Sequence, residues 1–490
     1  MQLTIKEICN ATLGHLKDED YGVVAHGVTI DSRENTEGLL FVPIVGEKFD
    51  GHEFISEAVN KGATCVLYER DFSLMNKYAT MKVPLIKVAS TRRALIDLAV
   101  YQRNKFNGQI VAITGSAGKT TTKDITASVV SQKYETLKTK GNFNNDIGLP
   151  LTLLSLQEKN NAMVLEMGMN HFGEIAVLSN LARPNLCIIT NIGDAHIENL
   201  GSRSGILKAK MEIFTGLQKN GTVILNGDDS MLGGISNVPN AVRIIDCHMK
   251  NVDTKMKSVK KNVVFADIIS RNGFMGTVCN IFWNIDGKGE GKIEVQIPLP
   301  GDHMVMNALM AFATGLVLDI EVDKIIEGIK AFKPSGYRMA MSKINGVTIV
   351  NDTYNASTLS MKATIDMMLV VPGRKVCILG DMFELGEFSE DLHNEIGRYA
   401  APKIDLMLTI GNLSKHIHEG FIAETSGNTE NSENGEKTPQ AAHFATKEDF
   451  LQHWQKYIKP DDTVLLKASR GVALETVADA MIAELENGEK

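Results

Sequence analysis

The chain has 490 residues, 43% of them hydrophobic and 22% charged, and a formal net charge of −8. A chain of this length is expected to form about three domains, each with its own core. The acidic balance argues against binding to nucleic acid, which needs a basic face. The six cysteines show no Cys-x-x-Cys spacing, which suits a reducing compartment and indicates no metal cluster. No run approaches about 18 uninterrupted apolar residues, so we expect a soluble, cytoplasmic protein without membrane insertion.

Residues 1–106 are predicted to form a small α/β domain, because short apolar strands alternate with helix-like stretches. Ser32 and Arg33 follow one of these strands, and a turn-rich loop covers residues 46–52. Loops at strand ends bind ligands in α/β folds, and an arginine can pair bidentately with a phosphate. Taken alone, however, the run Asp-Ser-Arg favours a turn with a local salt bridge.

Residues 107–331 are predicted to form a second domain around a phosphate-binding loop. An apolar strand breaks into Gly115, Ser116, Ala117, Gly118, Lys119, Thr120 and Thr121. Small residues between a buried strand and a helix start leave backbone N–H groups and the helix dipole free for an anion. Lys119 is expected over the outer phosphates of a nucleoside triphosphate, and Thr120 is expected to bind Mg²⁺. The glycines are closer than in the general G-x-x-x-x-G-K-[ST] pattern. The alternative, a glycine-rich helix cap, leaves Lys119 without a role.

Polar residues follow further strands of this domain. Asn144 and Asn145 lie in a loop that is either turn chemistry or a substrate-side loop presenting amides to a reacting carboxylate. Glu166 ends an apolar strand, where a carboxylate beside a phosphate loop is well placed to hold a metal. His196 follows the next buried strand and is a second candidate ligand. Lys210 lies in a predicted helix with one charged face, and such faces are usually exposed to solvent. This pattern alone gives Lys210 no catalytic role.

Residues 332–490 are predicted to form a third domain with a second doubly wound sheet, since strands again alternate with helices. The candidates for chemistry in this domain are Arg338; Asp352; Tyr354, Asn355 and Ala356; residues 380–387; and residues 467–471. Turns and salt bridges would explain any one of them, but their number in one domain favours a site. Residues 426–440 are polar and nearly devoid of apolar side chains, which predicts a mobile surface insertion.

The ordered set of motifs resembles the Mur ligases, which add amino acids to the nucleotide-linked peptidoglycan precursor. The matching runs are ITGSAGKTTT, GNFNNDIGLP, VLEMGMNHFGEI, TNIGDAHIENLGS, KAKMEIF, LNGDD, GDHMVMNAL, NDTYNASTLSM, LGDMFELGE and LLKASRG. The resemblance covers nearly the whole length, because it includes the runs DSR and FDGHEF near the front of the chain. The most specific runs, Asp-x-Tyr-Asn-Ala and LGDMFELGE, are similar to members that add D-alanyl-D-alanine to UDP-N-acetylmuramoyl-tripeptide. A run like DNPR or DDPR, by which a sister ligase recognises diaminopimelate or lysine, is not found in the sequence.

The resemblance implies an α/β protein of three domains: an N-terminal domain for the uridine nucleotide, a central P-loop ATPase and a C-terminal Rossmann-like domain. It implies ATP and Mg²⁺ as cofactors and two small-molecule partners, UDP-N-acetylmuramoyl-tripeptide and D-alanyl-D-alanine. The tripeptide carboxylate would attack the γ-phosphate to give an acyl phosphate and ADP. The dipeptide amine would then attack the carbonyl and expel phosphate. We expect the chain to be a monomer.

The resemblance also assigns roles by matching position. Thr120 and Glu166 would bind Mg²⁺, and His196 would help to hold a second metal. Lys210 would be carbamylated, which turns a cation into an anion that can coordinate or orient Mg²⁺. Contacts to ATP are implied for Asn307 (adenine), Arg338 (γ-phosphate) and Asp352 (ribose). Contacts to the other substrates are implied for Ser32, Arg33, Asn144, Asn145, Tyr354, Asn355 and Ala356. For Lys210, only the resemblance supports the role.

The chain departs from the family pattern at three places. Met304 stands where an asparagine is usual, Ser357 and Thr358 replace Asn-Pro, and Ala468 replaces a glycine. Two other functions stay open: a sister amide ligase, such as a folylpolyglutamate synthase-like enzyme or the ligase for the third amino acid, and a nucleotide-dependent switch that joins no substrates. A structural protein has only the polar insertion in its favour.

Overall fold

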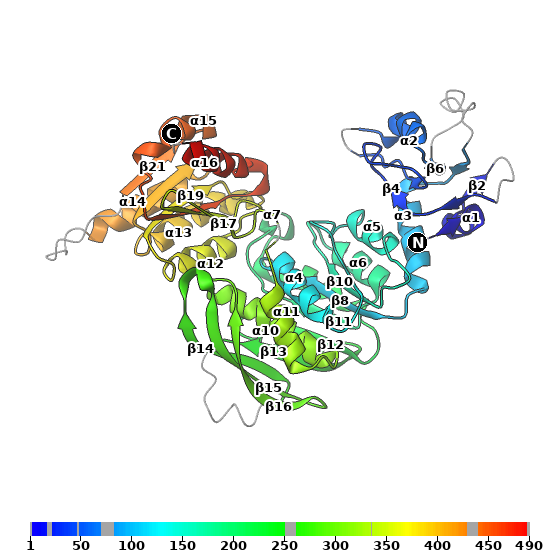
Figure 1. Ribbon diagram of the computed structural model, residues 1–490, viewed down its shortest axis with the longest axis horizontal. Helices are drawn as coiled ribbons and strands as arrows, with labels where there is room; N and C mark the ends of the chain where they lie inside the picture. Colours follow the sequence, from blue (N-terminus) through cyan, green and yellow to red (C-terminus); the bar gives the residue numbers. More distant parts are fainter. Residues whose placement is uncertain are drawn as a thin grey trace.

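The computed structural model describes residues 2–16, 22–46, 49–69, 83–249, 261–334, 336–428 and 440–487. These residues form three α/β units in chain order, and the first and third units lie at opposite ends of the second (Figure 1). The expected α/β class is confirmed. Within the described ranges, no helix is long and apolar enough to cross a membrane. Residues 429–439, most of the predicted insertion, and residues 47–48 of the first loop lie outside the described part.

The first unit is built on a five-stranded sheet with strand order β2-β7-β6-β5-β4, beside a separate antiparallel pair, β1 and β3. The neighbours from β4 to β7 are parallel, and β2 is antiparallel to β7. Its elements are β1 (Leu3–Thr4), α1 (Ile5–Thr12), β2 (His15–Leu16), β3 (Val24–Ala25), β4 (Val28–Thr29), β5 (Leu40–Phe41), η1 (Gly51–Phe54), α2 (Ile55–Asn60), β6 (Cys65–Tyr68), β7 (Leu85–Lys87) and α3 (Thr91–Asn104).

The second unit carries a nine-stranded sheet with strand order β16-β15-β14-β13-β12-β11-β8-β10-β9. Its elements are β8 (Gln109–Thr114), α4 (Lys119–Val130), β9 (Thr136–Lys138), α5 (Gly148–Leu154), β10 (Ala162–Glu166), α6 (Glu174–Ala182), β11 (Leu186–Ile189), α7 (Ile197–Leu200), α8 (Arg203–Met211), η3 (Glu212–Phe214), β12 (Gly221–Asn226), β13 (Ala241–His248), β14 (Val263–Arg271), η4 (Gly273–Met275), β15 (Thr277–Ile285), β16 (Gly289–Ile297), α10 (Asp302–Val317) and α11 (Val322–Ala331). The strands from β9 to β14 run parallel, whereas β14, β15 and β16 form an antiparallel meander.

The position of β8 explains where a site forms on this sheet. After β8 the chain places β9 and β10 on one side and β11 and β12 on the other. Such a switch in strand order leaves an opening at the carboxyl ends of the strands, where α/β folds bind ligands. Glu166, the last residue of β10, is opposite Ile113 of β8, and Ile189 of β11 is opposite Thr114. The loops after all three strands therefore emerge at one edge.

The third unit has a six-stranded sheet with strand order β17-β18-β22-β19-β20-β21, parallel except at the β17 edge. Its elements are β17 (Ala340–Ile344), β18 (Val347–Asn351), α12 (Thr358–Met368), β19 (Arg374–Gly380), η5 (Gly386–Phe388), α13 (Ser389–Ala400), β20 (Leu406–Ile410), α14 (Lys415–Asn428), β21 (Gln440–Phe444), α15 (Lys447–Leu451), η7 (Trp454–Lys456), β22 (Asp462–Lys467), η8 (Arg470–Val472) and α16 (Glu475–Asn487). The second doubly wound sheet predicted from the sequence is therefore present. The predicted boundaries after residues 106 and 331 fall between elements of different sheets, which supports them as proposals.

Candidate active site

A cavity of about 1190 Å³ is lined by residues of both the second and third units. This volume is somewhat above the range of about 300–1,000 Å³ that is typical of a site for one small ligand. Most of the residues predicted from the sequence line it: Ser116, Ala117, Gly118, Lys119, Thr120, Thr121, Asn144, Glu166, His196, Asn307, Arg338, Asp352, Tyr354, Asn355 and Ala356. The fold thus gathers side chains that are up to 240 positions apart in the numbering.

The predicted phosphate loop lies between β8 and α4 and has an open helix end. Gly118 precedes α4 with φ 79°, and no side chain caps the first N–H groups of this helix. The side chain of Asn191 holds the loop in place: it accepts a hydrogen bond from the Ala117 N–H at 2.8 Å and donates one to the Ala117 carbonyl at 3.0 Å. The free N–H groups and the helix dipole make the loop an anion site whose shape is fixed before a ligand arrives.

Gly115 is required by close contact as well as by backbone conformation. Its φ is +153°, and an added Cβ would lie 1.8 Å from Oγ1 of Thr190. We expect Gly115→Ala to lower the free energy of unfolding by about 1–3 kcal/mol, because the strand and the loop must shift apart. Thermal unfolding measures this, with Gly234→Ala as the control, since nothing lies within 4 Å of a Cβ there. Equal midpoints for the two variants would contradict the contact.

Lys119 is the cation of the loop. Its ammonium donates to the Gly115 carbonyl at 2.7 Å, so the side chain curls back over the loop. Burial lowers the pKa of Lys119, while the nearby Glu166 carboxylate raises it and the Arg338 guanidinium lowers it. A phosphate bound at the loop would favour the charged form of this lysine and accept its N–H groups.

Among the predicted metal ligands, Glu166 has the geometry that best suits this role. The residue is 2% exposed, and its carboxylate accepts hydrogen bonds from the Thr120 hydroxyl at 2.8 Å and from the Asn144 amide at 2.9 Å. A hydroxyl and a carboxylate at the end of a phosphate loop are hard oxygen donors, which fit Mg²⁺ with water completing its shell. No cluster of three or more acidic, histidine or cysteine side chains suited to a metal is found among the described residues.

His196 lies just before α7 with φ 65°, and its ring faces the third unit. Its Nδ1 lies 2.5 Å from Oε2 of Glu384, which follows β19. This contact lowers the pKa of the Glu384 carboxyl, and the charge of Lys119 adds to the effect. His196 therefore bridges two units, and metal binding through Nδ1 would need this pair to open. Its role as a ligand stays a prediction.

Lys210 on α8 is buried, with 1% of its surface exposed, although a solvent-covered face had been expected for this helix. The expectation of a solvated charge is thus wrong for this lysine. Burial, reinforced by the charge of Lys119, places the pKa of Lys210 well below its usual value. No hydrogen bond to its Nζ is found within the described ranges. Lys210 does not line the cavity.

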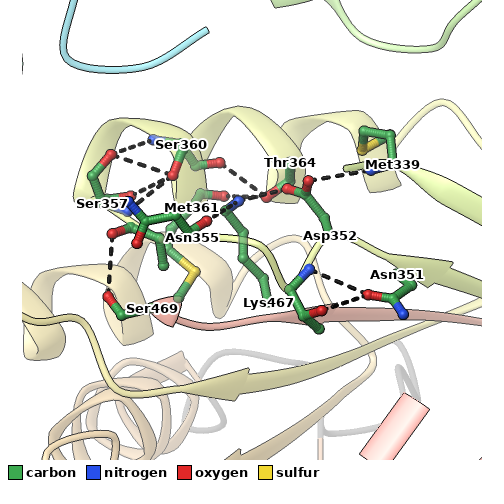
Figure 2. A network of polar contacts seen from close by, with 12 residues as sticks. Met339, Asn351, Asp352, Asn355, Ser357, Ser360, Met361, Thr364, Lys467 and Ser469 are labelled. Carbon is green, nitrogen blue, oxygen red and sulfur yellow. Dashed lines mark hydrogen bonds and ion pairs between the residues drawn. The ribbon is translucent and has the colours of Figure 1, made fainter. Parts of the chain in front are cut away.

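The third unit contributes an ion pair at the carboxyl ends of β18 and β22. Lys467 donates to Oδ2 of Asp352 at 2.5 Å and to the Asn355 carbonyl at 3.0 Å, so it ties both segments together (Figure 2). The other oxygen of Asp352 accepts the Met339 N–H at 3.2 Å (Figure 2). Both carboxylate oxygens are thus engaged, and contact with a ribose stays a prediction.

Arg338 and Tyr354 both line the cavity, and their side chains form a stacked pair. The Arg338 guanidinium carbon lies 3.5 Å from the centre of the Tyr354 ring, and the Arg470 guanidinium carbon lies 5.8 Å from it. Stacking of this kind holds a guanidinium in place without using its N–H donors. Arg338 therefore keeps donors for a phosphate while Tyr354 sets its direction.

Three predicted substrate residues lie outside the cavity. Asn145 accepts hydrogen bonds from the Gly148 and Ile147 N–H groups at 2.9 and 3.3 Å, so it caps the start of α5, which begins inside the predicted loop. Ser32 donates to Glu57 at 3.0 Å. Arg33 pairs with Asp31 at 2.6 Å and holds the pKa of that carboxyl at about 2, so the expected local salt bridge is confirmed. Substrate contacts of these three residues stay predictions.

The sequence did not single out every residue of the cavity. Arg271 lines it without having been noted in the sequence at all. Residues 142, 228, 302, 384, 467 and 470 also line it and had been noted only as parts of runs. Arg271 forms a bidentate salt bridge with Asp302, in which both N–O distances are 2.8 Å. The Asp-Asp run after β12 was a visible signal for Asp228, but Arg271 lies within an antiparallel strand that carries no local motif.

His303 gives the site a pH-dependent element. Burial lowers the pKa of His303 to about 4, from 6.5. Because the unfolded chain then binds the proton between these values, stability should fall as the pH drops through this window, by up to about 3 kcal/mol. We expect His303→Gln to lose less thermal stability than the wild type between pH 7 and pH 4.5. Identical pH profiles for the two proteins would contradict this cause.

Three protein-family models match this sequence. They are the Mur ligase family, catalytic domain, over residues 24–103; the Mur ligase middle domain, over residues 113–315; and the Mur ligase, glutamate ligase domain, over residues 337–470. The phosphate loop lies in the middle match, and the cavity joins the middle and last matches. The chain therefore belongs to the Mur ligase family.

Within that family, the chain is similar to the D-alanyl-D-alanine-adding members over its whole length. UDP-N-acetylmuramoyl-tripeptide–D-alanyl-D-alanine ligase of Bacillus subtilis is 37% identical over 485 residues, which cover 98% of each chain. The ligase of the same name from Escherichia coli is 33% identical over 495 residues, covering 100% of this chain and 99% of that one.

Solved structures agree with the architecture. MurF from Acinetobacter baumannii superposes with a TM-score of 0.84 at 29% identity, covering 99% of each chain. MurF ligase from Thermotoga maritima, in complex with ADP, superposes with a TM-score of 0.76 at 28% identity, covering 94% of this chain and 98% of that one. The three-domain Mur ligase fold expected from the sequence is thereby confirmed.

Proposed function

We propose that the chain is an ATP-dependent amide ligase that joins D-alanyl-D-alanine to UDP-N-acetylmuramoyl-tripeptide in the synthesis of the peptidoglycan precursor. The observation that carries this proposal is the cavity in which the phosphate loop of the second unit faces Arg338 and Tyr354 of the third. A cavity shared by two units can hold ATP on one side and a second substrate on the other. The whole-length relatives support the choice of substrates.

The proposed reaction brings two anions together, so its main need is positive charge. Lys119 and the free N–H groups of α4 bind the outer phosphates, and Arg338 directs its guanidinium to the γ-phosphate. The tripeptide carboxylate oxygen attacks the γ-phosphorus, and ADP leaves. The dipeptide amine then attacks the acyl carbon, and inorganic phosphate leaves with the former carboxylate oxygen. One amine proton is lost to solvent or to a nearby base.

Thr120 and Glu166 are the residues we propose to hold Mg²⁺, because their oxygens are adjacent and buried at the loop. When bound, the ion would neutralise charge on the phosphates. Asn144 orients the Glu166 carboxylate through its amide. The lowered pKa of Lys210 supports carbamylation, since only a neutral amine attacks carbon dioxide; proton loss then gives a carbamate anion.

A labelled-oxygen experiment tests the proposed acyl phosphate. The tripeptide substrate carries ¹⁸O in its terminal carboxylate, and the reaction contains ATP, Mg²⁺ and D-alanyl-D-alanine. The proposal predicts one ¹⁸O atom in each released phosphate and formation of the pentapeptide product, both seen by mass spectrometry. Pentapeptide with unlabelled phosphate would contradict the acyl phosphate, and phosphate release without an amide product would favour the nucleotide-dependent switch.

We also propose that the active unit is a monomer. The cavity is lined by residues of two units of the same chain, so a second copy is not needed to complete the lining described above. Light scattering after size-exclusion chromatography tests this, with one chain mass expected at the concentration used for the assay. An active dimer that loses turnover on dilution would contradict it.

A further inference from the structure

One short segment of the second unit contacts the third unit at two places. This segment, residues 191–198, follows β11 and includes the first two residues of α7. At its middle, Oδ2 of Asp194 accepts a hydrogen bond from the Thr358 hydroxyl, the first residue of α12, at 2.7 Å. At its end, the Glu198 N–H approaches the Glu384 carbonyl at 3.4 Å. The third unit therefore contacts this segment at two places, the start of α12 and the loop that contains Glu384.

The same segment holds the phosphate loop. The Ser116 N–H donates to the Asn191 carbonyl at 3.0 Å, and the Gly193 N–H donates to the Ser116 hydroxyl at 2.8 Å. Gly193 also packs closely on α12, since a Cβ there would lie 3.4 Å from the Leu359 side chain. Residues 191–198 thus connect the anion site directly to the third unit.

The Thr358 hydroxyl is free for this contact because another residue caps the helix. Ser357 accepts the Ser360 N–H at 3.4 Å and forms the capping box of α12. Thr358 is 2% exposed, and the Asp194 side chain is 23% exposed, so the bond is largely shielded from water. A carboxylate at the first turn of a helix is further favoured by the helix dipole.

We infer that Asp194 and Thr358 are positioning residues that dock the third unit over the phosphate loop. This inference rests on the proposed ligase function for its kinetic consequence. Docking holds Tyr354 and Asn355, which lie four and three residues before Thr358, in the lining of the cavity that they share with the phosphate loop. Without the bond, ATP would still meet an intact loop, but the dipeptide side of the cavity would be less often in place.

A double-mutant cycle tests the pair, using Thr358→Val, Asp194→Ala and the double variant. Asp194 also lies 3.9 Å from Arg203, and the cycle separates that contact from the bond to Thr358. We expect each single variant to raise KM for D-alanyl-D-alanine about tenfold, with little further change in the double variant and little change in KM for ATP. Thr358→Ser keeps the hydroxyl and should retain wild-type values.

Thr425→Val is the matched control. Its hydroxyl is also buried in the third unit, but it bonds within its own helix, to the Phe421 carbonyl at 3.0 Å. Values for Thr358→Val equal to those of the control, or purely additive effects in the cycle, would overturn the inference.

A scattering measurement separates this inference from the proposed function. Small-angle X-ray scattering of each variant needs no turnover, so it remains decisive even if the wild type makes no amide. We expect a larger radius of gyration for Thr358→Val than for Thr358→Ser and Thr425→Val. An equal radius for all three would overturn the docking role, whatever the enzyme proves to catalyse.

Discussion

Lys119→Ala is expected to abolish turnover while the fold stays intact. The lysine is the cation of the phosphate loop, and its present hydrogen bonds are to the loop carbonyls of Gly115 and Ser116, so no distant packing depends on it. Removing a preorganised charge from the site of phosphoryl transfer should lower kcat by at least about 100-fold. Coupled ATPase assays measure kcat, and thermal unfolding checks the fold.

Lys324→Ala is the control for this variant. Lys324 lies on α11, is 53% exposed and pairs only with the neighbouring Glu327 among the described residues. Its loss should leave turnover at the wild-type level. Near-normal turnover in Lys119→Ala would remove the basis for the phosphate-loop assignment.

Lys210→Ala is the second variant with a large expected effect. The buried amine, with its pKa held low by burial and by Lys119, is suited to carbamylation, and the carbamate would replace a charge that repels Lys119 with one that attracts it. We expect this variant to be almost inactive and to recover part of its activity when a short-chain carboxylic acid is added, because the acid can occupy the vacated space with the same charge.

Two comparisons make this rescue specific. The same acid should not restore Lys119→Ala, whose missing group is a cation. In the wild type, ¹³C-labelled carbon dioxide should give a carbamate resonance that Lys210→Ala lacks. Full activity of Lys210→Ala without any acid would count against carbamylation, and so would equal rescue of both variants.

Local sequence patterns were sufficient to predict the strand, turn and helix start that form the proposed phosphate loop. Strand, turn and helix start follow one another within residues 110–122, so their geometry depends on neighbours in the chain. The position of Glu166 could also be predicted, because an acid at the end of an apolar strand must emerge at the carboxyl edge of a parallel sheet. The strand order that puts β8 between β10 and β11 is a tertiary property, and sequence order alone does not specify it.

Other features depend on contacts between distant segments. Lys210 looked like a solvated charge because its helix carries several charged residues, and only the packing of α8 shows that it is buried. The pairing of His196 with Glu384 joins residues of two units, and no spacing in the sequence indicates it. The contact of Asn145 is local instead: its side-chain amide oxygen accepts hydrogen bonds from two N–H groups of its own loop, and its contact with substrate stays a prediction.

The structure gives physical meaning to two of the departures from the family pattern. The Met304 sulfur lies 4.0 Å from the side-chain nitrogen, Nδ2, of Asn307. The side-chain oxygen, Oδ1, of Asn307 accepts a hydrogen bond from the Thr122 hydroxyl at 3.1 Å. Asn307 is therefore oriented by α4 and lies beside the phosphate loop. Thr358 supplies the hydroxyl that bonds to Asp194. Neither position disturbs Lys119 or Glu166.

The measurement that tests the central claim most directly is phosphate release from ATP by the purified chain. The assay contains Mg²⁺ and UDP-N-acetylmuramoyl-tripeptide, with and without D-alanyl-D-alanine. We expect rapid release only when both the tripeptide and the dipeptide are present, together with one pentapeptide formed for each phosphate. Phosphate release at the same rate with and without the dipeptide would contradict the proposed ligase. The substrate role of the Tyr354 loop would then be the first assignment to be abandoned.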